Sequence, residues 1–132
     1  MAVENNSAPA NAALERHGAV FTALRQILKP YEDVLAVRTD KPGHCYMETR
    51  TASLNGRRLF FGGAKVKKNY VSFYLMPLYM LPDLCNRISH VLKKLMQGQS
   101  CFNFTQPDQG CFDELNQLTE SAFQKLKQEA LL

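Results

Sequence analysis

Four short strand-like runs, separated by short connections, constrain the fold more than any other feature of the chain. They occupy residues 34–39, 45–53, 58–61 and 70–76. Parallel neighbours in a sheet need a crossover of a dozen or more residues, and none of these connections is that long. The four runs are therefore expected to pair antiparallel, each with the next along the chain.

The residues between these runs favour chain reversal. Pro42 and Gly43 stand in the first connection, and such residues are typical of turns. Asn55-Gly56, in the second, is the strongest short hairpin signal in the sequence. The third connection is expected to be a loop that contains Gly62-Gly63 and a basic cluster.

Apolar residues at helical spacing predict three helices. The first covers residues 14–28. A second is expected to begin with Asp83 as its N-cap and to stop at Gly98, with Ser89 as a second cap at which it could restart. The last begins at Asp108 and is strongly amphipathic.

With a fifth alternating run at residues 100–105, the expected fold is α+β. It has a five-stranded, mainly antiparallel sheet with helices packed on one face, in the order α-β-β-β-β-α-β-α. Residues 1–11, rich in Asn, Ala, Ser and Pro, are expected to form a disordered tail. Residues 12–132 are expected to form a single domain, which suits a chain of 132 residues.

Composition narrows the classes of function. The net charge of +4 permits weak attraction to anionic partners without requiring it. The N-terminus lacks the pattern of a secretory signal, and the most apolar run, residues 70–82, is too short to span a membrane. We therefore expect a cytoplasmic protein with reduced thiols, no cofactor and no metal. The four cysteines match no zinc spacing; they are Cys45, Cys85, Cys101 and Cys111.

Strand alternation predicts a candidate binding surface on one face of the sheet. If helices cover one side of the sheet, Val71, Phe73 and Phe104 face the core, and the residues between them face outward. The outward set is aromatic and mostly basic, with Glu48 as its carboxylate, and a lysine-rich rim adjoins it. The predicted ligand or interface residues are Arg38, Tyr46, Arg50, Arg58, Lys65, Lys67, Lys68, Tyr70, Ser72, Tyr74 and Asn103.

Three uses fit this surface: a homodimer interface, a site for a small anionic ligand, and a base-stacking surface for nucleic acid. Equally, Tyr and Arg could stand there only for strand propensity and solubility. The leading hypothesis is a non-enzymatic binding or assembly module with no catalytic residues. The alternative is a cysteine-dependent enzyme or redox sensor that uses Cys45 or Cys101.

The stretch YVSFYLMP at residues 70–77, followed by GQSCFNF at 98–104, resembles the bacterial YdhG-like domain family of unknown function. The resemblance implies an antiparallel sheet with helices packed on it. Some relatives are likened to frataxin, which implies iron handling through an acidic helix surface. Here the first helix sets Glu15 against Arg16 and Arg25, so iron binding stays a secondary alternative.

Overall fold

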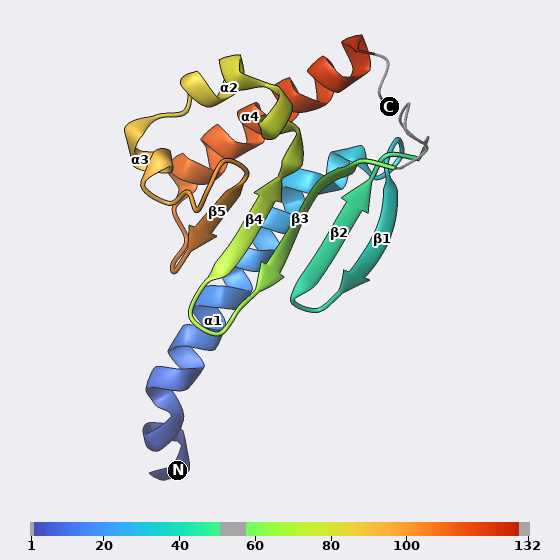
Figure 1. The fold of residues 1–132 in the computed structure, drawn as a ribbon. Coiled ribbons are helices and arrows are strands. Elements are labelled where there is room, and N and C mark those ends of the chain that lie inside the picture. Colours follow the sequence, from blue (N-terminus) through green and yellow to red (C-terminus); the bar gives the residue numbers. More distant parts are fainter. Residues whose placement is uncertain (1, 51–57, 130–132) are drawn as a thin grey trace.

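The computed structural model describes residues 2–50 and 58–129 of the protein, and the side chains of its first helix from Leu14 on. The described residues form a five-stranded antiparallel sheet in which each strand pairs with the next along the chain (Figure 1). The predicted α+β fold is confirmed. The hairpin expected at Asn55-Gly56 lies outside the described residues, and the expected disorder of residues 1–11 stays a prediction.

The chain order of the elements is close to the predicted one. The strands are β1 (Ala36–Lys41), β2 (His44–Glu48), β3 (Phe60–Val66), β4 (Val71–Leu75) and β5 (Cys101–Phe104). The long helices are α1 (Ala2–Leu28) and α4 (Gln109–Gln128), and the short helices are η1 (Lys29–Tyr31), η2 (Met76–Met80), α2 (Pro82–Asn86) and α3 (His90–Lys93).

Helices α1 and α4 lie on the same face of the sheet (Figure 1). Phe73 and Phe104, which alternation places in the core, are fully buried between sheet and helices. Tyr31 of η1 contacts the rings of Phe61 and Phe123, and its hydroxyl donates to Glu120 of α4. On the opposite side of the sheet, here called the open face, none of the described residues forms a long helix (Figure 1).

Strand β3 is longer than predicted, because Gly62 and Gly63 lie inside it and not in a loop. Both positions admit no side chain. A Cβ on Gly62 would lie 2.9 Å from the carbonyl oxygen of Tyr74 in β4 and 3.1 Å from Leu28 Cδ2 of α1, and one on Gly63 would lie 2.6 Å from the carbonyl oxygen of Cys45. The two glycines therefore let the neighbouring strands β2 and β4, and the Leu28 side chain of α1, approach β3 closely.

The predicted middle helix is broken into α2 and α3. Asp83 is not an N-cap and lies in the first turn of α2. Ser89 does cap α3, since its Oγ accepts the N–H of Leu92 at 3.1 Å, and the carboxylate of Glu114 accepts both the N–H and the hydroxyl of Ser89. Asp108 caps α4 as predicted.

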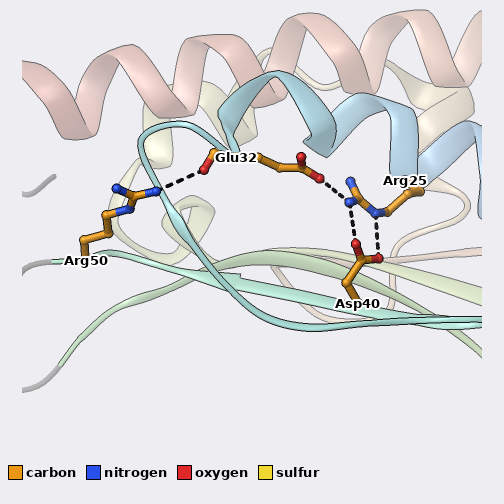
Figure 2. Close-up of polar contacts among 4 residues, drawn as sticks. All are labelled: Arg25, Glu32, Asp40 and Arg50. Carbon is orange, nitrogen blue, oxygen red and sulfur yellow. Dashed lines mark hydrogen bonds and ion pairs between the residues drawn. The ribbon is translucent and has the colours of Figure 1, made fainter.

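Arg25 joins α1 to two neighbouring elements (Figure 2). Its Nη2 forms an ion pair with Glu32, which follows η1, and a second ion pair of 3.0 Å with Asp40 of β1. These partners raise the pKa of Arg25, most strongly through the hydrogen bond to Asp40. The same bond lowers the pKa of Asp40. The guanidinium thus fixes the first helix on the edge strand.

We expect Arg25→Ala to lower the free energy of unfolding by about 1–3 kcal/mol, because hydrogen bonds to charged groups are lost. Arg16→Ala, at an exposed position of the same helix, should change it by less than about 0.5 kcal/mol. The measurement is urea unfolding. Since the pKa of Asp40 is lowered on folding, this stabilisation is present above the ordinary pKa of Asp and is lost as pH falls through the folded value. Equal losses for both variants at pH 7 would contradict the assignment.

We expect Gly63→Ala to destabilise the fold by about 1–3 kcal/mol or more, because its Cβ would overlap a backbone oxygen that cannot move alone. Gly18→Ala is the matched control. A Cβ there meets nothing within 4 Å, and Ala is favoured in a helix, so this change should stabilise by up to about 1 kcal/mol. Thermal unfolding of both variants measures the contrast, and a fully stable Gly63→Ala protein would show that the approach of β2 and β3 is not tight.

A candidate binding surface on the open sheet face

Cross-strand pairing arranges the outward side chains of the open face in three rows, which follow one another about 7 Å apart along the strands. The first row crosses all five strands, the second does so one pair further along, and the third covers β1 to β3. In order, the rows are Lys41, His44, Lys65, Ser72 and Asn103; Thr39, Tyr46, Gly63, Tyr74 and Cys101; and Ala36, Glu48 and Phe60.

Three rings form a continuous group, here called the aromatic row: Tyr46, Phe60 and Tyr74. The rings of Tyr46 and Phe60 are stacked with centroids 4.5 Å apart, and those of Phe60 and Tyr74 are 6.2 Å apart and tilted. Gly63 separates the two tyrosines across the sheet and has no side chain to displace the Phe60 ring. The row therefore spans three strands without a gap.

Phe60 is absent from the predicted site, and a register irregularity explains its position. The pairing of β2 with β3 shifts between Met47 and Glu48, so Phe61 is an extra residue in β3. Phe60 consequently faces outward while Phe61 and Gly62 both face α1. Strict alternation from the outward Arg58 would have found Phe60, although it would also have placed Gly62 on the wrong face.

At one end of the aromatic row, a carboxylate holds two arginines. Glu48 accepts from Arg38 Nε at 2.8 Å, lies 3.7 Å from Arg58 Nη1, and is 3.4 Å from the Tyr46 hydroxyl. The Glu48 side chain is 13% exposed, whereas Arg38 and Arg58 are 51% and 43% exposed. The arginines therefore present their charge to solvent, and Glu48 serves to position them.

The other end of the open face is basic as well. Lys65 stands between His44 and Ser72 in the first row, and Lys67 follows in the turn after β3. A hydrogen bond from Lys67 to Tyr74 raises the pKa of this lysine. The pKa of His44 is lowered by burial and then by Lys65 and Lys41, so this imidazole is neutral at pH 7.

The side chains of Ser72 and Asn103 are hydrogen-bonded to each other and are not two independent site residues. Ser72 is buried, and its hydroxyl donates to Asn103 Oδ1 at 2.7 Å. Cys101 Sγ lies 3.4 Å from the same oxygen. The expectation that the Ser72 side chain is accessible is wrong, because neighbouring side chains cover this short residue in the middle of the sheet.

The remaining predicted residues divide by position. Tyr70 and Lys68 lie in the turn before β4, at the basic end of the open face. Arg50 does not join the surface: its Nη2 donates to the carbonyl oxygen of Glu32 at 3.3 Å, on the side of the sheet that carries the helices (Figure 2). Arg50 follows the end of β2, where strand alternation no longer fixes the direction of a side chain.

The pKa of three thiols is raised, which works against their activation. Burial raises the pKa of Cys45 and Cys101, and burial with Asp108 raises that of Cys111 to about 11. His44 and Cys45 point to opposite faces of β2. Within the described part of the chain, no group of three or more His, Cys, Asp and Glu side chains is placed to hold a metal ion.

A scan against protein-family models and searches of the curated proteins and the solved structures found no match. The resemblance to YdhG-like domains therefore stays a prediction. Among the described helices, none combines the length and apolar character that crossing a membrane requires.

We expect thiol alkylation at pH 8 to label Cys101 more slowly than a free peptide thiol of ordinary pKa, about 8.5, because a raised pKa leaves less thiolate. The buried Cys45 and Cys111 should resist labelling until the protein unfolds. Mass spectrometry of a time course gives each rate. Faster labelling of Cys45 or Cys101 than of the peptide would support the thiol-enzyme alternative.

Proposed function

We propose that the protein is a non-enzymatic binding module and that its open sheet face binds an anionic partner with planar groups. One observation carries the proposal: the aromatic row lies between two groups of exposed cations. Tyr and Arg side chains supply rigid contact area and planar donors, and both are enriched at binding hot spots.

The balance of charge on the open face favours an anion. Its cations include both arginines that pair with Glu48, on one side of the aromatic row, and the lysines of the first row, on the other side. Glu48 is the carboxylate among them, and its contacts with the two arginines already engage it. An anionic group could contact the outer edges of these guanidinium groups while a planar group packs against Tyr74 or Tyr46.

We also propose that the chain is a member of the YdhG-like family, that it is cytoplasmic and that it has no catalytic activity. The raised pKa of the thiols supports a role that does not depend on a nucleophile. A second copy of the chain is the competing occupant of this surface, since the same side chains also suit a homodimer interface.

A single-stranded oligothymidylate of about ten nucleotides provides a probe with both phosphates and planar rings. We expect it to bind with an affinity that falls as salt rises, by about 0.7 log units per tenfold salt for each phosphate contacted. Tyr74→Ala should weaken binding about tenfold, since stacking on an aromatic side chain is lost. Fluorescence anisotropy measures the affinity, and Tyr79→Ala, at an exposed position on η2, is the matched control.

Cys101 gives an independent test, because it lies beside Tyr74 in the second row. Bound oligonucleotide should slow its alkylation. Equal weakening by Tyr74→Ala and Tyr79→Ala, or unprotected Cys101, would contradict binding at the open face. Light scattering that shows a dimer which Tyr74→Ala dissociates would replace the anionic partner with a second copy of the chain.

A further inference from the structure

A second concave site lies away from the open face, among the short helices. An open cleft of about 590 Å³ is lined by residues of η2, α2, α3 and the segment after them. Pockets that hold small molecules have volumes of about 300–1,000 Å³, so this cleft is large enough for one. Breakage of the expected middle helix at Ser89 creates it, because α2 and α3 diverge there instead of continuing as one rod.

The lining of the cleft is part apolar and part polar, with slightly more apolar surface. Leu78 and Ile88 are buried residues whose side chains line it, and Met96 and the half-buried Cys85 contribute further apolar surface. The apolar part of this lining favours a hydrocarbon or aromatic body by removing its surface from water. Gly98, at the entrance, has a φ of +76°, and a Cβ there would meet nothing within 4 Å. The space beside this glycine is therefore open.

The polar side chains of the cleft complement an anion. Lys93 is the charged residue of the lining, and the amides of Asn86 and Gln99 can both donate hydrogen bonds. Nearby carboxylates point elsewhere: Glu114 is engaged by the N–H and hydroxyl of Ser89, and Asp83 lines a different cleft. A carboxylate in this cleft would meet donors without meeting a like charge.

We propose that this cleft binds a small amphipathic carboxylate, with its apolar body against Leu78, Ile88 and Met96 and its carboxylate at Lys93. A neutral ligand would leave Lys93 unused, and a cation would be repelled by it. The site is separate from the open face and does not depend on the function proposed there.

The native cysteines make the two sites distinguishable in one experiment. Cys85 lines the cleft, and Cys101 belongs to the open face. We expect octanoate, used below its aggregation concentration, to slow the alkylation of Cys85 in a saturable manner and to leave the rate at Cys101 unchanged. Octanol and octylammonium, which share the apolar body, should protect Cys85 about tenfold less well, because they lack the charge-assisted hydrogen bond.

Lys93→Gln should weaken protection of Cys85 by octanoate about tenfold or more. Lys94→Gln is the matched control, since Lys94 is the next residue, is exposed and does not line the cleft. Isothermal titration of the same variants gives the dissociation constants directly and does not depend on thiol chemistry.

Several results would overturn the proposal. Equal protection of Cys85 and Cys101 would mean that octanoate acts as a surfactant without a site. Equal protection of Cys85 by octanol would show an apolar cleft with no preference for an anion. Equal effects of Lys93→Gln and Lys94→Gln would remove Lys93 as the group that holds the carboxylate. None of these outcomes bears on oligonucleotide binding at the open face.

Discussion

The close approach of β2, β4 and the Leu28 side chain of α1 to β3, at Gly62 and Gly63, is the constraint on which the rest of the structure depends. A side chain at Gly62 would overlap the backbone of β4 and press on Leu28 of α1, and one at Gly63 would overlap the backbone of β2. Because α1 lies so near, Leu28 is fully buried and one face of the sheet is closed. The same absence of side chains lets Phe60 lean between Tyr46 and Tyr74 on the other face. Core packing and candidate surface thus share a single backbone requirement.

The two proposed sites illustrate different ways in which a fold exposes chemistry. The open face is a regular surface on which strand alternation gathers rings and cations from β1, β2, β3 and β4. The cleft beside α2 and α3 exists because a helix is interrupted, and its lining comes from irregular segments. On the open face, burial raises the pKa of the Cys101 thiol, which lowers its reactivity as a nucleophile. Both sites are suited to binding by shape, apolar contact and charge.

Sequence patterns predicted the elements that depend on local periodicity. The short connections required an antiparallel sheet, and alternation placed Phe73 and Phe104 in the core, where they are buried. Ser89 and Asp108 were recognisable as caps because their side chains act on N–H groups three residues away. Predictions were less accurate where long-range packing decides, as at Gly62-Gly63, which resembles a loop in sequence yet lies within β3.

By itself the sequence determined the fold class, the phase of β4 and β5, and the basic and aromatic character of the outward residues, since each follows from neighbours a few positions apart. Tertiary structure alone decided that Phe60 faces outward past a bulge, that Ser72 is covered, and that Arg50 turns toward Glu32. The cleft among the short helices also depends on the tertiary structure alone. These features depend on contacts between segments that are distant in the chain, and no local sequence pattern indicates them.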